Sequence, residues 1–291
     1  MTLTRRRFLT ITAAVAAHPA SAGTEHWRGQ ALGADVSVTV RGPREAARHA
    51  IAETRTLLAQ IDALFSLYDP SSTLSQLNRR GVVDAPDPRF VTLMQAADWG
   101  FRVTGGLFDP TVQPLWLASA AGQDPAAGCA AVGWNRVRFN AGLVQLDAGQ
   151  ALTFNGIAQG FATDLVSDRL TALGLRDVLV NIGEYRALGG PWRLAISDPM
   201  HGMLGMRTLT DSAIATSSPT AMQLGAQTHI LHPTARPNWS TVSVEATTAT
   251  LADCLSTALC LAPRDQIAAL RDVPEVMRIT LVDFDGNLFT V

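Results

Sequence analysis

Cysteine is scarce in this sequence. Only three cysteines, Cys129, Cys254 and Cys260, occur among 291 residues, and no two of them form a CxxC pair. An odd number of scattered cysteines excludes a complete disulfide framework. Cys254 and Cys260 fall within one predicted helix, where a buried free thiol packs as a small apolar side chain. We therefore interpret these two thiols as part of the core.

Several familiar catalytic motifs are also missing. The sequence has no GxGxxG after a strand, no GxxxxGK[ST], no HExxH and no GxSxG. Its six histidines are spread along the chain, and none stands at zinc-ligand spacing from another His or Cys. These absences exclude the common nucleotide-binding, zinc and serine-hydrolase motifs as the source of an activity.

Charged residues are sparse as well. They make up 16% of the chain against 47% apolar residues, a composition that suits one globular unit. The first 22 residues contain three arginines and no acid, so their removal changes the net charge from −2 to −5. A mildly acidic body offers no broad basic surface, which argues against nucleic acid and anionic membranes as partners.

Residues 1–22 have the pattern of an export signal. Twin arginines within Arg5–Arg7 stand directly before Phe8-Leu9, and a short Ala-rich run leads to Ala20-Ser21-Ala22, which fits an A-x-A cleavage site. The apolar run is too short to remain as a membrane-spanning helix. We expect export by the twin-arginine route, which carries folded cargo, and a mature periplasmic unit of residues 23–291.

The order of the predicted elements indicates an α+β fold. Apolar residues at helical spacing predict helices over residues 43–65, 90–103 and 157–173, and a further helix over 251–261. Alternating apolar residues predict a strand over Leu32–Val40, and turn residues later in the chain predict several hairpins. Helices and hairpins do not alternate regularly, so we predict one compact unit of mixed or antiparallel sheets with packed helices.

The first segment that could carry chemistry is a strand, a turn and a helix. A short strand predicted over Ala151–Phe154 leads into Asn155-Gly156, and a helix follows. The free N–H groups at such a helix start favour phosphate, and Gly156 and Gly160 allow a ligand to come close. The same pattern is common in proteins without any ligand there, so on its own it is a weak signal.

The second segment is a helix start that contains an acid and a hydroxyl. Asp253 and Thr257 are four residues apart and face the same side of a predicted helix, with Thr250 as its expected N-cap. Two hard oxygens one turn apart suit Mg²⁺, which completes its shell with water and phosphate. Alternatively, Asp253 favours the helix dipole and Thr257 bonds back to the helix. The spacing alone does not separate these two interpretations.

The third segment is Thr228-His229-Ile230-Leu231-His232-Pro233. A histidine beside a turn proline can act as a base near a phosphoryl group, because its ordinary pKa lies near neutrality. A structural or solvent-facing histidine is the alternative, and it is the commoner case for a single His.

Taken in order, these segments resemble the ApbE family of FAD:protein FMN transferases. The similarity runs from about Leu32 to Leu261. The matching segments are Leu32-Gly33, Phe65–Asn78, Thr104–Val112, Thr153–Asp164, Asn181–Gly183, Ala215–Ser217, His229-Ile230 and Asp253–Thr257. The resemblance implies that FMN is moved from the donor FAD to a Ser or Thr of an acceptor protein, that AMP is released, and that Mg²⁺ is used.

The resemblance also implies roles for particular residues. Asp253, Thr257 and the backbone carbonyl of Gly156 would hold Mg²⁺ against the diphosphate of FAD. His229 would lie near the reacting phosphate and help to deprotonate the acceptor hydroxyl, so His229 and Asp253 are the candidate catalytic residues. The residues expected to contact the rest of FAD are Leu32, Tyr68, Leu107, Phe108, Asp109, Thr153, Gln159 and Ile230.

The sequence departs from the family pattern at several positions. The usual Ala-Lys-Gly reads Ala158-Gln159-Gly160, the Gly-Gly-Asp reads Gly183-Glu184-Tyr185, and His232 replaces an Asp. Losing a Lys near phosphate removes one cation, and losing a nearby Asp partly offsets that change. Asp253 and Thr257 are retained, so we expect cation binding to survive.

Export by the twin-arginine route together with this divergence is similar to the NosX-type branch of the family. Members of that branch flavinylate the membrane protein NosR, which nitrous oxide reductase requires. Two other functions stay open at this point. Water could replace the acceptor hydroxyl, which would make the protein an FAD pyrophosphatase. The altered Lys and Asp positions would also fit a flavin carrier or assembly factor without turnover.

Overall fold

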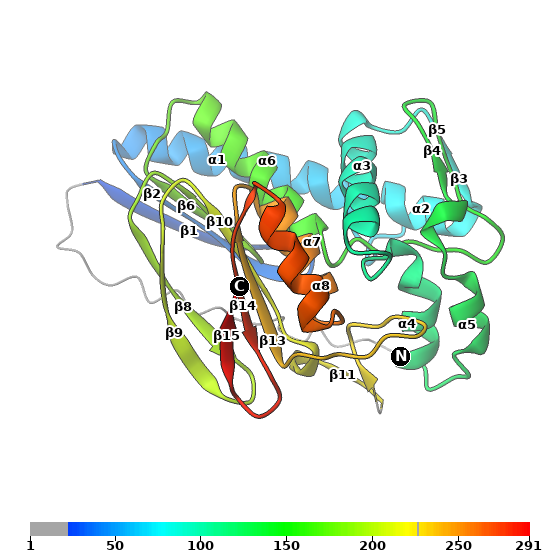
Figure 1. The fold of residues 1–291 in the computed structure, drawn as a ribbon. Helices are drawn as coiled ribbons and strands as arrows, with labels where there is room; N and C mark the ends of the chain where they lie inside the picture. The colour runs from blue at the N-terminus through cyan, green and yellow to red at the C-terminus, as the bar shows by residue number, and fades with distance from the viewer. Residues whose placement is uncertain (1–22, 226) are drawn as a thin grey trace.

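The computed structural model describes residues 23–225 and 227–291 (Figure 1), so the predicted export signal in residues 1–22 lies outside the described residues. The helices are α1 (Arg44–Phe65), α2 (Thr73–Arg80), α3 (Pro88–Val103), α4 (Gln113–Ala120), α5 (Ala126–Ala131), α6 (Ala158–Ala172), α7 (Ala249–Leu259) and α8 (Arg264–Ala268), with 3-10 turns η1 (Pro110–Val112), η2 (Trp134–Arg136), η3 (Pro219–Ala221) and η4 (Ala269–Asp272). The strands are β1 (Thr24–Ala31), β2 (Ala34–Arg41), β3 (Val82–Asp84), β4 (Arg138–Phe139), β5 (Leu143–Gln145), β6 (Val178–Ile182), β7 (Tyr185–Leu188), β8 (Trp192–Asp198), β9 (Gly202–Leu209), β10 (Ala213–Ser217), β11 (Gln223–Leu224), β12 (Gln227–Thr228), β13 (Thr241–Ala246), β14 (Val276–Val282) and β15 (Leu288–Thr290).

The centre of the fold is an eight-stranded sheet in the order β1-β2-β6-β7-β10-β13-β14-β15. Neighbouring strands are antiparallel throughout, with Val38 of β2 opposite Val180 of β6 and Ala215 of β10 opposite Val244 of β13. The predicted α+β class with antiparallel sheets is therefore confirmed.

Helices cover one face of this sheet, and a hairpin covers the other. Strand β6 shows the division, because successive side chains of a strand point to opposite faces. Val178, Val180 and Ile182 pack in the core that includes α1 and α6, whereas Leu179 packs with Trp192 of the β8–β9 hairpin. Figure 1 shows α6 in green and α7 in orange side by side over the sheet.

A cluster of aromatic rings fixes the segment that leads into α6. The ring of Phe65 at the end of α1 stacks on Phe90 of α3 at a centroid distance of 5.4 Å, and Phe154 meets Phe90 edge-on at 5.8 Å. Phe154 is 1% exposed, so its backbone has little freedom. This packing holds the chain in place just before the candidate site.

The predicted strand over Leu32–Val40 is wrong at its start. Leu32 and Gly33 form the turn of the β1–β2 hairpin and both have positive φ angles, of +49° and +77°. Strand β1 was not predicted at all. Its side chains lie at a sheet edge and are mostly exposed or half-buried, so its sequence carries little apolar alternation.

The predicted strand over Ala151–Phe154 is also wrong, since this segment pairs with no strand. The side chain of Asn78 satisfies the backbone of Leu152 instead, donating to its carbonyl at 2.8 Å and accepting from its N–H at 2.7 Å. The N–H of Thr153 donates to the carbonyl of Pro110 at 2.8 Å. A side chain can therefore replace a partner strand here, which sequence patterns do not reveal.

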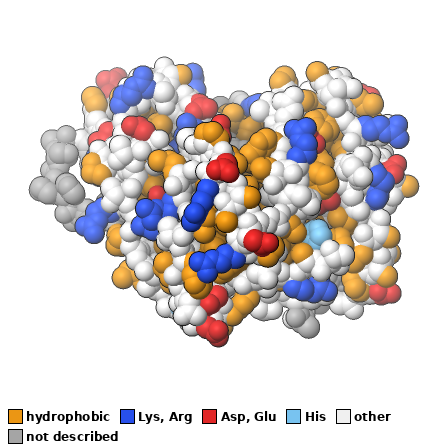
Figure 2. Space-filling model, viewed as in Figure 1, with side chains coloured by type: hydrophobic (Ala, Val, Ile, Leu, Met, Phe, Trp, Pro, Cys, Tyr) orange, Lys and Arg blue, Asp and Glu red, His pale blue; other side chains and the backbone are white. Residues whose placement is uncertain are grey.

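Within the described ranges, no helix has the combination of length and apolar character that crossing a membrane requires. On the face drawn in Figure 2, acidic and basic side chains are interspersed and no broad basic area is present.

Candidate active site

The site forms where the first turns of α6 and α7 meet. Gly160 allows this approach, because a methyl group at that position would lie 2.6 Å from the carbonyl carbon of Ala249 and 2.7 Å from Cβ of Asp253. The N–H of Gly160, which belongs to the first turn of α6, donates to Oδ2 of Asp253 at 2.9 Å. A first-turn N–H has no partner within its own helix, so this bond uses an available donor to orient the carboxylate.

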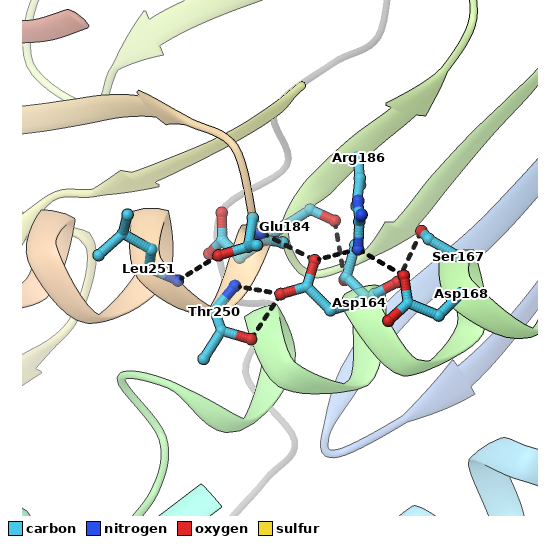
Figure 3. Close-up of polar contacts among 10 residues, drawn as sticks. Asp164, Ser167, Asp168, Glu184, Arg186, Thr250 and Leu251 are labelled. Carbon is cyan, nitrogen blue, oxygen red and sulfur yellow. Dashed lines mark hydrogen bonds and ion pairs between the residues drawn. The ribbon is translucent and has the colours of Figure 1, made fainter. Parts of the chain in front are cut away.

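Asp164 fixes α7 against α6 (Figure 3). Its carboxylate accepts hydrogen bonds from the N–H groups of Ala249 at 2.9 Å and Thr250 at 2.8 Å, and it pairs with Arg186 at 2.8 Å. A negative charge at a helix start is favourable, so Asp164 stabilises α7 from outside that helix. The N-cap of α7 is Thr248, whose side chain accepts from the N–H of Leu251, and the prediction of Thr250 as the cap is wrong.

Asp253 is a buried carboxylate with an available oxygen. It is 3% exposed, and its pKa is raised to about 7. Burial is the main cause, the hydrogen bond from Gly160 opposes the rise, and the charge of Asp164 contributes to it. Among the described residues, Asp253 has Gly160 as its hydrogen-bond donor and takes part in no ion pair. The sequence contains no lysine. A buried carboxylate without a basic partner is well suited to hold a cation.

Thr257 and Gly156 complete the predicted metal set. A methyl group on Gly156 would lie 2.9 Å from Oγ1 of Thr257, so the backbone of Gly156 lies against that hydroxyl. Asp253 and Thr257 lie one turn apart on α7, as the sequence predicted. The structure thus brings Gly156, Asp253 and Thr257 together.

The chemistry of these groups fits magnesium. In the described part of the chain, no cluster of three or more His, Cys, Asp or Glu side chains could hold a metal ion. A cation at this position would bind to a carboxylate, a hydroxyl and backbone oxygen, with water and phosphate as further ligands. Hard oxygen ligands of this kind suit Mg²⁺ better than the softer transition metals.

A small pocket is lined by residues that neighbour Gly156 in the sequence. Its lining includes Leu32, Tyr68 and Gln159, three of the residues predicted to contact FAD, together with Asn155. Tyr68 is 68% exposed, so its side chain is accessible at this pocket. Asn155 precedes Gly156, so the pocket and the cation residues share one stretch of backbone.

Leu107, Phe108, Asp109 and Thr153 lie in two segments that touch at Pro110. Phe108 is 5% exposed and packs in the core, and the carboxylate of Asp109 accepts from the N–H groups of Thr111 at 2.8 Å and Trp134 at 3.2 Å. These two side chains therefore have structural contacts of their own. Their contact with FAD stays a prediction.

His229 lies close to the end of β10. Its Nδ1 is 3.1 Å from the carbonyl of Pro219 and 3.4 Å from that of Met222. Carbonyl oxygens only accept, so Nδ1 carries the proton in the neutral ring, and Nε2 is the nitrogen with a lone pair. Burial lowers the pKa of His229, which favours this neutral form. Ile230 is 8% exposed and packs in the core beside α7.

Two polar residues of this region had no predicted role. Ser217, at the end of β10, has its hydroxyl 3.3 Å from Oγ1 of Thr257 and 2.8 Å from Oγ of Ser256. Glu184 is buried, and burial together with the charge of Asp253 raises its pKa well above the ordinary value. Ser217 lies in a segment that matches the family motifs, whereas Glu184 lies where the sequence departs from them. A single Ser or Glu in a strand or bend has no pattern that indicates its neighbours.

The fold and the site together define an α+β protein in which two helix starts present oxygen ligands beside a small pocket. The ApbE family model matches residues 32–279, and the chain belongs to the ApbE family.

Several known proteins are similar to this chain. A Rhodobacter capsulatus protein named FAD:protein FMN transferase is 37% identical over 170 residues, which are 53% of this chain and 31% of that protein. A Vibrio cholerae protein of the same name is 26% identical over 275 residues, covering 81% of this chain and 82% of that protein. The apo structure of Pseudomonas stutzeri flavinyl transferase ApbE has a TM-score of 0.79 at 26% identity, covering 92% of this chain and 93% of that one.

Proposed function

We propose that this protein transfers FMN from FAD to a Ser or Thr hydroxyl of an acceptor protein and releases AMP in a Mg²⁺-dependent reaction. The observation that carries the proposal is the meeting of Gly156, Asp253 and Thr257 beside the pocket that contains Leu32 and Tyr68. The names of the similar proteins support the same activity.

Separate residues of this chain would hold the magnesium ion and position FAD. Asp253, Thr257 and the backbone of Gly156 would hold the magnesium ion, while Gly160 keeps the Asp253 carboxylate in place. When bound, Mg²⁺ supplies a positive charge that neutralises the charge growing on the pyrophosphate oxygens. Tyr68 would position the flavin end of FAD, because its ring is exposed at the pocket.

His229 is suited to assist the acceptor hydroxyl. A base must be neutral at working pH, and burial lowers the pKa of His229 in that direction. Its Nδ1 donates to the backbone carbonyls at residues 219 and 222, so Nε2 is the nitrogen without a proton in the neutral ring.

The location and the acceptor are part of the same proposal. We propose that the chain is exported by the twin-arginine route and acts in the periplasm, on the strength of the pattern in residues 1–22. A membrane protein similar to NosR is the proposed acceptor, on the strength of the resemblance to the NosX-type branch.

Mass spectrometry of an acceptor tests the reaction directly. The purified protein is mixed with FAD, Mg²⁺ and an acceptor domain that carries the target Ser or Thr, and the acceptor is weighed. A gain of one FMN with release of AMP supports transfer. Free FMN in the absence of acceptor supports a pyrophosphatase. Retention of intact FAD supports a flavin carrier, which the replacement of the family's Lys by Gln159 would favour.

A matched pair of variants tests the site. Asp253→Ala should abolish transfer, because it removes the carboxylate that would hold the ion. Asp272→Ala, which removes an exposed carboxylate in η4, should leave transfer unchanged. Full transfer by Asp253→Ala would contradict the assignment of the metal site.

A further inference from the structure

Glu184 is a buried carboxylate to which the proposed reaction gives no role. It lies in the bend between β6 and β7 and is 6% exposed. Its backbone carbonyl accepts from the hydroxyl of Thr163 on α6 at 3.1 Å, and its Oε2 accepts from the N–H of Thr216 on β10 at 3.2 Å. These two bonds place Glu184 between α6 and β10.

The contacts of Glu184 bring it next to Asp253. Thr163, which holds Glu184, lies one helical turn after Gly160, which holds Asp253. On the other side, Thr216 precedes Ser217, whose hydroxyl is 3.3 Å from that of Thr257. The charge of Asp253 acts on Glu184 strongly enough to raise its pKa beyond the effect of burial. Two buried carboxylates therefore lie close together in one part of the interior.

No basic side chain compensates this pair within the described ranges of the chain. Arg186 is occupied by Asp164 at 2.8 Å and by Asp168 at 3.0 Å, and neither Glu184 nor Asp253 takes part in an ion pair there. Because the sequence lacks lysine, arginine and histidine are the remaining basic side chains. Two buried negative charges without a counter-charge are strongly unfavourable, and a divalent cation would neutralise both.

We propose that Glu184 is a second carboxylate of the cation site and that its charge, together with that of Asp253, holds the divalent ion. The inference rests on the proposed function, because it takes Asp253 and Thr257 as cation ligands. Adding a second acidic oxygen group makes the site more selective for a hard divalent ion and raises its affinity.

Titration with Mg²⁺ alone tests the proposal without any flavin. Isothermal titration calorimetry compares the full chain with Glu184→Gln, which keeps the size of the side chain and an oxygen that can accept from Thr216. The variant should bind Mg²⁺ about 10- to 100-fold more weakly, the usual effect of removing a partner close to a metal. Asp168→Asn, which neutralises a carboxylate that is 66% exposed on α6, should bind Mg²⁺ as the unmodified chain does.

Thermal unfolding with and without Mg²⁺ distinguishes a role of Glu184 in cation binding from a purely structural role. Without metal, Glu184→Gln should unfold at the same or a higher temperature than the unmodified chain, because the repulsion with Asp253 is removed. Mg²⁺ should then raise its unfolding temperature less than it does for the unmodified chain. A residue that only supports the fold would lower the unfolding temperature in both conditions.

The outcomes separate this inference from the proposed function. Equal Mg²⁺ affinity in Glu184→Gln and the unmodified chain, with binding abolished in Asp253→Ala, overturns the role of Glu184 and leaves the proposed function standing. An unmodified chain that transfers FMN but binds no Mg²⁺ overturns both metal assignments. If Glu184→Gln does not fold, Glu184→Asp should retain more affinity than Glu184→Ala, and equal affinities overturn the inference.

Discussion

Gly160 lets the first turns of α6 and α7 pack closely together. A methyl group there would lie 2.6 Å from the carbonyl carbon of Ala249 and 2.7 Å from Cβ of Asp253, where carbon atoms normally stay about 3.5–4.0 Å apart. Replacing Gly by Ala in a helix gains about 1 kcal/mol of propensity, while overpacking a filled site costs about 1–3 kcal/mol. Backbone atoms of α7 are involved and cannot rotate away, so we place the cost of Gly160→Ala at the upper end. The expected net loss of stability is about 1–2 kcal/mol.

Thermal unfolding followed by circular dichroism measures this loss. For a protein of this size, about 1–2 kcal/mol lowers Tm by roughly 2–8 °C. Gly142→Ala is the matched control, because a methyl group on this exposed loop residue would meet only Oδ1 of Asn140, at 3.4 Å. The Mg²⁺ affinity of Gly160→Ala should fall as well, because the added methyl group would push Asp253 away from the N–H of residue 160. An unchanged or raised Tm in Gly160→Ala would refute the close packing on which the described site depends.

The pKa of Asp253 is about 7 in the folded protein and about 3.9 in the unfolded chain. In the metal-free protein, the contribution of Asp253 to the free energy of unfolding should therefore be largest below about pH 4 and should be lost as the pH rises through 7. Urea unfolding at pH 5 and pH 8 measures the difference, which Asp253→Asn should reduce. His229→Gln should lower FMN transfer by about 100-fold or more without changing Mg²⁺ affinity; a rate equal to that of the exposed control His49→Gln would remove His229 from the reaction. Asp164→Asn should cost about 2–3 kcal/mol of stability in guanidinium unfolding, because charge-assisted bonds to Thr250 and Arg186 are weakened, and an unchanged midpoint would contradict this role.

Helix α1 could be predicted from the sequence because it has an apolar stripe along one face. Helix α1 begins and ends within one residue of the prediction, since Pro43 marks its start and buried residues such as Ile61 recur along one face. Strand β1 could not be found in this way, because an edge strand with polar side chains has little alternation to detect. Leu32 was expected in a strand but lies in a turn. Its φ angle is positive, which is unusual for a leucine.

The candidate site was partly visible in the sequence. The spacing of Asp253 and Thr257 follows from helix geometry alone, so their common face could be predicted. Their meeting with Gly156 depends on how two helices pack, and the resemblance to a family supplied that expectation. Glu184 and Ser217 come together because β7 pairs with β10, a strand that is distant from it in the sequence. Local sequence patterns do not encode that pairing.

The hydrogen bond from Gly160 to Asp253 joins residues 93 positions apart, so the site forms between a middle and a late segment of the sequence. A polypeptide that ends before residue 249 would contain the whole of α6 but would lack Asp253 and Thr257. It should therefore not bind Mg²⁺ at the proposed site. Ion binding at the proposed site would therefore require that residues 249–259 have been synthesised and have docked against α6. By mass action, an ion present at 100 times its Kd would add about 2.7 kcal/mol of resistance to separating these two segments.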